Sequence, residues 1–213
     1  MSIAKPLPDT LLAQYKNWQA TGFAEQAAHF ASLEKGQSPL AMVISCCDSR
    51  VQASEIFGAA AGTFFFHRNI ANLVPPYASG SDHHGTASAI EYAVKALNVP
   101  HIIIMGHAQC GGVQACYDMC EGGIAAADSG FEFVGHWLEN LRPAHARVSG
   151  EGDARVVEMG HQGVIGSLDN LMGYPFVRDA VEAGTLQLHG TWHNFATGTL
   201  YAFNPDTDGF EGQ

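Results

Sequence analysis

The stretch His101-Ile-Ile-Ile-Met-Gly-His-Ala-Gln-Cys-Gly-Gly112 decides the fold and the chemistry that we expect for this chain. The residues from Ile102 to Met105 are apolar and mostly β-branched, which is typical of a strand that is buried on both faces of a parallel sheet. Two metal-binding residue types, His107 and Cys110, follow in the next turn. Cysteine is also common as a small buried apolar residue, so this pair alone is a weak indication of a metal site.

A second apolar run ends in the same way and strengthens that indication. The strand predicted at Leu40-Ala-Met-Val-Ile-Ser45 is followed by Cys46-Cys-Asp-Ser-Arg50. Because parallel strands of one sheet end along a common edge, Cys46 is expected to lie beside His107 and Cys110. Two thiolates and one imidazole are the protein ligands of a catalytic zinc site that leaves the fourth position for water. We therefore predict one Zn2+ ion per chain at this edge.

A carboxylate and an arginine follow the first of these cysteines. Asp48 lies two residues after Cys46, on the same side of an extended chain, and Arg50 lies two residues further on. A guanidinium group that binds the carboxylate would keep it ionised and oriented. Asp48 and Arg50 are therefore candidate catalytic residues.

Length and composition favour one α/β domain. The chain has 213 residues, of which 46% are hydrophobic, and a formal net charge of -11. This charge argues against nucleic acid or an anionic membrane as a partner, because neither would be attracted to it. No stretch approaches about 20 apolar residues and the N-terminus lacks a continuous apolar run, so we expect no membrane span, no secretory signal and a cytoplasmic location. Neither a Gly-Lys phosphate loop nor a G-x-G-x-x-G motif follows a predicted strand, which argues against nucleotide chemistry.

The cysteine content suits a reducing compartment. Five cysteines, an odd number, argue against a disulfide framework. Cys47, Cys116 and Cys120 are not needed for the predicted zinc site, and we expect them to be small core or helix-face residues. Cys116 and Cys120 are four positions apart and can share a helix face, but a second metal site there would lack its other ligands.

The order of the predicted elements indicates a parallel sheet. Strands are predicted at residues 40–45, 63–68, 102–105, 185–189 and 199–203. A helix between the second and third strands implies right-handed crossovers. Residues 150–173 are expected to form helix and loop, because glycines interrupt their helical pattern. Two amphipathic helices precede the first strand, and their pattern fits packing on another subunit as well as packing on their own sheet.

These segments together resemble the β-class carbonic anhydrases, and within that family the plant-like branch with an open active site. The matching segments, in the family's order, are Cys46-Cys-Asp-Ser-Arg50, Phe66-His-Arg-Asn-Ile-Ala-Asn72, Glu91-Tyr-Ala-Val94 and Gly106-His-Ala-Gln-Cys-Gly-Gly112. Roughly residues 35 to 120 carry the resemblance, with softer agreement to about residue 200. Cys47 stands where serine is usual, but that side chain is not a ligand in the family.

The resemblance implies one domain over residues 1–213, with a central sheet of four parallel strands and one antiparallel strand flanked by helices. It implies zinc bound by Cys46, His107 and Cys110. It also implies a homodimer as the smallest unit, with a tetramer or a larger assembly left open. We expect residues 1–36 to form a helical arm that packs on the partner subunit.

The implied activity is the reversible hydration of CO2 to bicarbonate and a proton by attack of a zinc-bound hydroxide. Asp48 would accept the hydrogen bond of that hydroxide, while Arg50 keeps Asp48 ionised and turned away from zinc.

Four further residues are expected to contact the substrate. Gln37, which lies nine positions before the first zinc cysteine, matches a pocket glutamine of the plant-like branch, and the backbone N–H near Gly111 is a second donor to substrate oxygens. Phe65 and Tyr92 match apolar pocket residues that come from the neighbouring subunit in that branch.

Two other functions use the same residues. A hydrolase of carbonyl sulfide or carbon disulfide would attack a similar linear molecule with the same zinc chemistry. A noncatalytic zinc or bicarbonate-binding protein would close the metal with a fourth protein ligand, and the presence of Asp48, Arg50 and Gln37 argues against it.

One branch of the family is inhibited through a second bicarbonate site built from a tryptophan, an arginine and a tyrosine. In this sequence Val43 and His193 stand at the places of the tryptophan and the tyrosine, and only Arg68 remains. Valine cannot supply an indole N–H to an anion. We therefore predict that this switch is absent and that Asp48 stays paired with Arg50.

Overall fold

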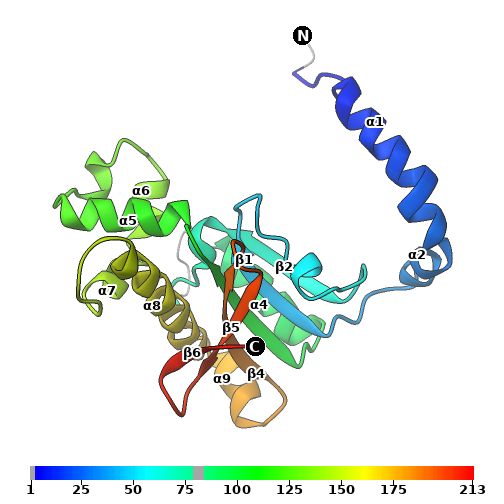
Figure 1. The fold of residues 1–213 in the computed structure, drawn as a ribbon. Coiled ribbons are helices and arrows are strands. Elements are labelled where there is room, and N and C mark those ends of the chain that lie inside the picture. Colours follow the sequence, from blue (N-terminus) through cyan, green and yellow to red (C-terminus); the bar gives the residue numbers. More distant parts are fainter. Residues whose placement is uncertain (1–2, 79–83) are drawn as a thin grey trace. The chain divides into compact units, whose positions relative to one another are not determined.

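The computed structural model describes residues 3–78 and 84–213 (Figure 1). The described chain falls into two compact units that meet in the sequence between Gln37 and Ser38.

The first unit consists of short helices around a small aromatic cluster. Its elements are α1 (Asp9–Trp18), a π-helical turn (Gln19–Phe23) and α2 (Ala27–Leu33). The ring of Trp18 lies 5.5 Å from that of Phe23 and 5.9 Å from that of Phe30, measured between centroids. No described residue of this unit is buried. Its packing on a partner subunit stays a prediction.

The second unit is built on one mostly parallel sheet, which confirms the predicted fold class. Its strands are β1 (Ala41–Cys46), β2 (Phe64–Asn69), β3 (His101–His107), β4 (Gln187–Asn194), β5 (Thr199–Asn204) and β6 (Gly209–Gly212). Their order in the sheet is β2-β1-β3-β4-β5-β6. The first four strands in this order are parallel, and β5 and β6 are antiparallel to their neighbours. The sheet thus contains a short sixth strand, β6, that the sequence did not predict.

Helices and helical turns connect and flank these strands. They are α3 (Ala53–Ile56), a 3-10 turn (Ile70–Asn72), α4 (His84–Glu91), a π-helical turn (Tyr92–Ala96), α5 (Gly111–Glu121), a 3-10 turn (Ala126–Asp128), α6 (Val134–Leu138), α7 (Arg142–His145), α8 (Gly152–Met172) and α9 (Pro175–Glu182). Among the described helices, none has both the length and the apolar content that crossing a membrane would require.

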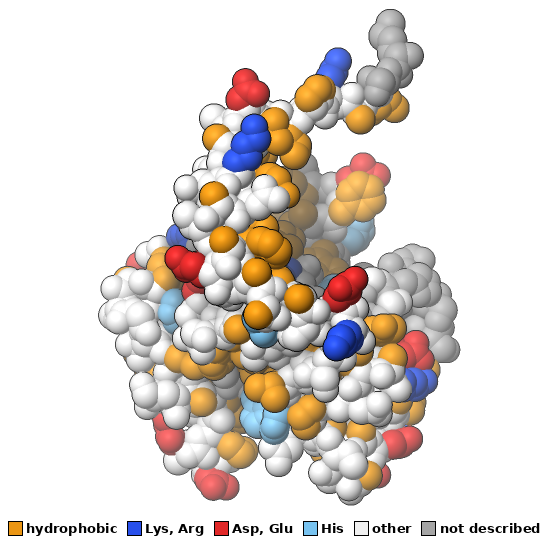
Figure 2. Space-filling model, turned by 90° about the vertical axis from the view of Figure 1, so that its right-hand side faces the viewer, with side chains coloured by type: hydrophobic (Ala, Val, Ile, Leu, Met, Phe, Trp, Pro, Cys, Tyr) orange, Lys and Arg blue, Asp and Glu red, His pale blue; other side chains and the backbone are white. Residues whose placement is uncertain are grey.

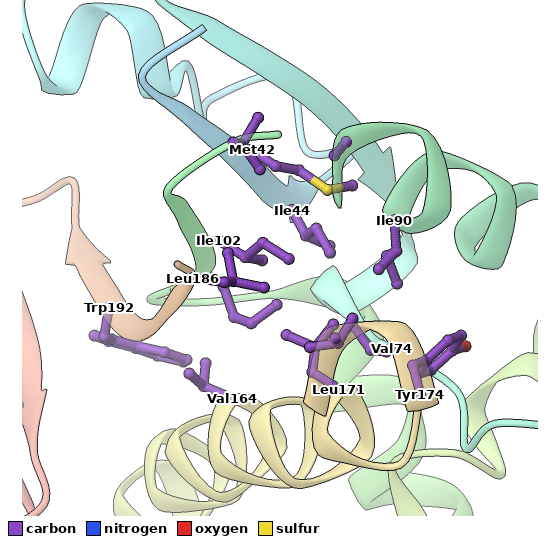
Figure 3. Packing of buried hydrophobic residues seen from close by; sticks show 14 residues of the cluster. Met42, Ile44, Val74, Ile90, Ile102, Val164, Leu171, Tyr174, Leu186 and Trp192 are labelled. Carbon is purple, nitrogen blue, oxygen red and sulfur yellow. The ribbon is translucent and has the colours of Figure 1, made fainter. Parts of the chain in front are cut away.

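The main hydrophobic core lies between the sheet and α8. In Figure 3 side chains from β1 and β3, among them Ile44 and Ile102, point toward Val164 and Leu171 of α8. All four of these side chains are fully buried. The β-branched run at the centre of the sheet therefore packs on α8, and the same cluster includes Ile90 of α4 and Val177 of α9.

The prediction of helix and loop over residues 150–173 is wrong, because α8 is continuous from Gly152 to Met172. Two of its glycines face the core at close range. A Cβ atom on Gly160 would lie 2.3 Å from the Trp192 ring, and one on Gly163 would lie 2.6 Å from Leu141. These glycines allow close packing, and the burial they permit outweighs their weak helix propensity.

Candidate metal centre and active site

Three potential metal ligands meet at the carboxyl edge of the sheet. Cys46 is the last residue of β1, His107 is the last residue of β3, and Cys110 directly precedes α5. Because β1 and β3 are adjacent and parallel, their ends coincide. The three ligand atoms lie within 4.8 Å of one another, and all three residues are buried. The structure thus brings together the three residues that the sequence singled out.

The spacing and chemistry of this set fit a zinc ion. The Sγ atoms of Cys46 and Cys110 are 3.9 Å apart. Two sulfur atoms at about 2.3 Å from a tetrahedral zinc ion would be separated by about 3.8 Å. Nδ1 of His107 donates a hydrogen bond to the carbonyl oxygen of Ala108 at 2.9 Å, which leaves Nε2 as the atom with the free lone pair. Nε2 is buried and has no hydrogen-bond partner among the described residues, as expected for a nitrogen that binds a metal.

Backbone N–H groups stabilise the negative charge of both sulfur atoms. A hydrogen bond from the Cys110 thiol lowers the pKa of Cys46 to about 4 against the effect of burial, and the same bond raises the pKa of Cys110. The N–H of Asp48 acts on Cys46, and the N–H groups of Gly112 and Val113 act on Cys110, each lowering the pKa of its thiol. Overall the pKa is lowered for Cys46 and raised for Cys110, so a cation bound here would meet the Cys46 thiolate and would itself favour loss of the Cys110 proton.

Asp48 and Arg50 form a bidentate ion pair beside this set. Arg50 donates from Nε to Oδ1 of Asp48 at 2.9 Å and from Nη2 to Oδ2 at 2.7 Å. Its backbone N–H also donates to Oδ1, at 3.0 Å. These hydrogen bonds hold the pKa of the Asp48 carboxyl well below its usual range. Nη2 of Arg50 also donates to the carbonyl oxygen of Gln109 at 3.1 Å, which links the pair to the turn between His107 and Cys110.

Arg68 has a role that the sequence did not predict. Its Nε donates to the carbonyl oxygen of Cys46 at 2.9 Å, and its Nη2 donates to those of Asp48 at 2.8 Å and Val51 at 2.9 Å. The guanidinium group of Arg68 thus holds the loop that carries Cys46 and Asp48. Every residue carries a backbone carbonyl oxygen, so these contacts leave no side-chain pattern in the sequence and depend on the fold.

Two residues of the supposed second bicarbonate site are buried. Val43 is fully buried in β1, and His193 is 8% exposed in β4, where it lies in register with His107. Burial lowers the pKa of His193, and the nearby His107 adds to this effect.

The predicted substrate residues are placed in different parts of the chain. The rings of Phe65 and Tyr92 pack at 5.8 Å between centroids, and Tyr92 is 51% exposed. Gly111 begins α5, and a Cβ atom there would meet nothing within 4 Å. Gln37 belongs to the first unit, so its contact with the site stays a prediction.

The remaining cysteines differ in burial. Cys116 is buried in α5, as expected, and Cys120 lies partly exposed on the same helix. Cys47 is exposed, so its assignment to the core or to a helix face is wrong. It lies just beyond the end of β1 and lines a hollow of about 1180 Å³ that contains none of the three metal ligands.

Phe195 is a second residue near the site that the sequence did not single out. Its ring centroid lies 4.6 Å from Cζ of Arg50 and 6.2 Å from the ring of His107. It follows β4 directly, so the rule that parallel strands end along a common edge would have placed it here if the strand had been predicted to reach Asn194.

The fold and these residues define an α/β protein with three candidate metal ligands at the carboxyl edge of its sheet, and comparison with known proteins identifies the family. The model of the carbonic anhydrase family matches residues 41–200. The chain is 33% identical over 205 residues to β carbonic anhydrase 5, chloroplastic, of Arabidopsis thaliana; the match covers 93% of this chain and 65% of that protein.

Two solved structures are similar over nearly the whole chain. The β-carbonic anhydrase CcaA has a TM-score of 0.88 at 27% identity, with 96% of this chain and 91% of that chain covered. A structure of the tetrameric β-carbonic anhydrases of Sordaria macrospora has a TM-score of 0.75 at 28% identity, with 92% and 96% covered. The chain therefore belongs to the β-class carbonic anhydrases, a family of carbonate dehydratases.

Proposed function

We propose that this chain catalyses the reversible hydration of CO2 to bicarbonate and a proton, with one zinc ion held by Cys46, His107 and Cys110. The observation that carries the proposal is the juxtaposition of two buried sulfur atoms and Nε2 of His107, which has no hydrogen-bond partner among the described residues, all within 4.8 Å and next to a carboxylate–arginine pair. Zinc, when bound, supplies a Lewis acid that lowers the pKa of its water ligand to about 7.

The protein side chains orient the reactants. Asp48 is an acceptor only, because Arg50 keeps its carboxyl ionised, and it can therefore fix the direction of an O–H group in the site. Arg50 occupies both carboxylate oxygens and so holds Asp48 in one orientation. We assign Gln37 and the N–H near Gly111 as donors to substrate oxygens. Phe65 and Tyr92 supply an apolar wall suited to CO2.

We also propose that the active form is a homodimer or a tetramer. The first unit exposes apolar side chains, with Tyr15 and Trp18 at 52% and 44%, and Tyr92 of the second unit is 51% exposed. In Figure 2 hydrophobic side chains are seen at the surface between scattered charged groups. Exposed aromatic surface of this kind favours burial against another subunit. The tetrameric relatives from Sordaria macrospora support self-association. Residues 1–36 would then form the arm that packs on the partner.

A cytoplasmic location also remains a proposal, since one relative is named as chloroplastic.

The test is stopped-flow CO2 hydration with zinc quantified per chain on the same preparation. We expect about one zinc per chain and a rate that scales with zinc content. Parallel assays with carbonyl sulfide and carbon disulfide separate the rival hydrolase. Faster turnover of either sulfur compound than of CO2, or no turnover at full zinc content, would contradict the proposal.

A further inference from the structure

An aromatic ring from the β4–β5 turn borders both the ion pair and one metal ligand. Phe195 places its ring centroid 4.6 Å from Cζ of Arg50, which is a cation–π distance. The same ring lies 6.2 Å from the ring of His107, at an interplanar angle of 36°. The Phe195 side chain therefore lies beside both Arg50 and His107.

The backbone around Phe195 is fixed by local hydrogen bonds. The side chain of Asn194 accepts a hydrogen bond from the backbone N–H of Ala196 at 3.0 Å, and the turn closes through Gly198 at a φ of +71°. The carbonyl oxygen of His193 accepts a hydrogen bond from the N–H of Ala108 at 2.9 Å. This last bond ties the end of β4 to the residue after His107, so the ring is held at a defined place relative to the metal ligands.

The contact with Phe195 matters because the Arg50 side chain is itself partly exposed. Its side chain is 48% exposed, whereas that of Asp48 is 16% exposed. Solvent-exposed ion pairs are weak, partly because long side chains lose rotamer freedom when they are held in one geometry. A ring over the guanidinium plane attracts the cation and removes water from that face. The ring therefore favours the rotamer in which both carboxylate oxygens are bound.

We propose that Phe195 is a positioning residue for the Asp48–Arg50 pair, acting through the guanidinium group of Arg50. The consequence for catalysis rests on the proposed function, whereas the contact itself does not. Without the ring, Arg50 samples other rotamers and Asp48 is held in its productive orientation for a smaller fraction of the time.

The test compares Phe195→Leu, which keeps an apolar side chain but removes the ring face, with Phe195→Tyr, which keeps that face. Phe176→Leu is the matched control, because the Phe176 ring lies 4.8 Å from Nζ of Lys95, a cation–π contact away from the metal centre. We expect kcat to fall about two- to fivefold in Phe195→Leu, with KM and zinc content unchanged, and to be retained in Phe195→Tyr and in the control.

A second readout uses the zinc-free protein and no activity. The Nε–H of Arg50 is observed by 15N NMR and assigned through its loss in Arg50→Lys. Its hydrogen exchange should be about two- to fivefold faster in Phe195→Leu than in wild type, and unchanged in Phe195→Tyr and Phe176→Leu. Wild-type exchange in Phe195→Leu, or equal acceleration in Phe195→Tyr, would overturn the proposal. If no variant hydrates CO2, the proposed function fails, and the exchange rates still decide the role of Phe195.

Discussion

The carboxyl edge of the sheet and the N-terminal unit differ in how far their characteristic side chains are buried within one chain. At the sheet edge, Cys46 and His107 end adjacent strands, Cys110 precedes α5, and all three are buried within one unit. In the N-terminal unit, Tyr15 and Trp18 remain about half exposed and no described residue is buried. The three candidate metal ligands therefore come from one chain, whereas the N-terminal helices offer apolar surface that we propose a second chain covers.

The largest effect is expected from removing one of the three candidate metal ligands at the sheet edge. Cys110→Ala leaves two protein ligands, which cannot hold zinc with the affinity of three, so metal and CO2 hydration should both be lost. Zinc per chain and stopped-flow rates check this. Cys47→Ser is the control, because Cys47 is exposed and outside the ligand set. Full zinc content in Cys110→Ala would show that the ligand assignment is wrong.

The next prediction concerns the N-terminal side. Trp18→Ala removes the ring that contacts Phe23 and Phe30, and with it the largest aromatic side chain of the unit. If this unit packs on a partner, the dimer dissociation constant should rise about 30-fold, the effect of losing an aromatic anchor. Light scattering over a dilution series measures it, with Gln26→Ala as an exposed polar control from the same unit. A wild-type protein that is fully active as a monomer would refute the dimer.

A smaller effect is expected from disturbing the close packing of α8 at Gly160. Gly160→Ala places a Cβ atom 2.3 Å from the Trp192 ring, so we expect the free energy of unfolding to fall by about 1–3 kcal/mol. Gly166→Ala lies in the same helix but meets nothing within 4 Å, and it should be neutral or slightly stabilising. Denaturant unfolding of both variants gives the comparison. Equal effects would mean that α8 does not depend on close packing at Gly160.

The smallest expected effect is on the pH dependence of folding. Burial lowers the pKa of His161, whose ring stacks on Phe210 at 4.4 Å, although Glu158 opposes the shift. The unfolded chain then binds more protons than the folded chain, so stability should fall as the pH drops below about 6.5. His161→Phe keeps a stacked ring and removes the titration, which should reduce this slope. Unfolding curves between pH 5 and 8 measure it, and an unchanged slope in the variant would contradict the assignment.

Local sequence patterns predicted the strands that consist mainly of buried apolar residues. The β-branched run before His107 and the apolar run before Cys46 gave two adjacent parallel strands, and the edge rule then placed the metal ligands together. The pattern at residues 199–203 also predicted β5 as a hairpin partner, which pairs antiparallel with β4, whereas the candidate substrate residues came from the resemblance and stay predictions. Patterns were misleading where packing decides the outcome, as at Gly160, where a residue that weakens isolated helices is required by Trp192.

Other features left no local pattern at all. The sixth strand is only Gly-Phe-Glu-Gly, too short and too rich in glycine to show alternation. The bonds from Arg68 to backbone carbonyl oxygens and the ring of Phe195 over Arg50 join residues that are far apart in the sequence. Such contacts depend on how the loops are placed by the sheet, which periodicity does not encode.

X-ray absorption at the zinc edge, recorded on the active wild-type enzyme, tests directly whether Cys46, His107 and Cys110 bind the metal. We expect two sulfur ligands at about 2.3 Å, one imidazole nitrogen at about 2.0–2.1 Å and one further light atom. A site with a different number of sulfur ligands, or with a second imidazole, would contradict the assignment of Cys46, His107 and Cys110.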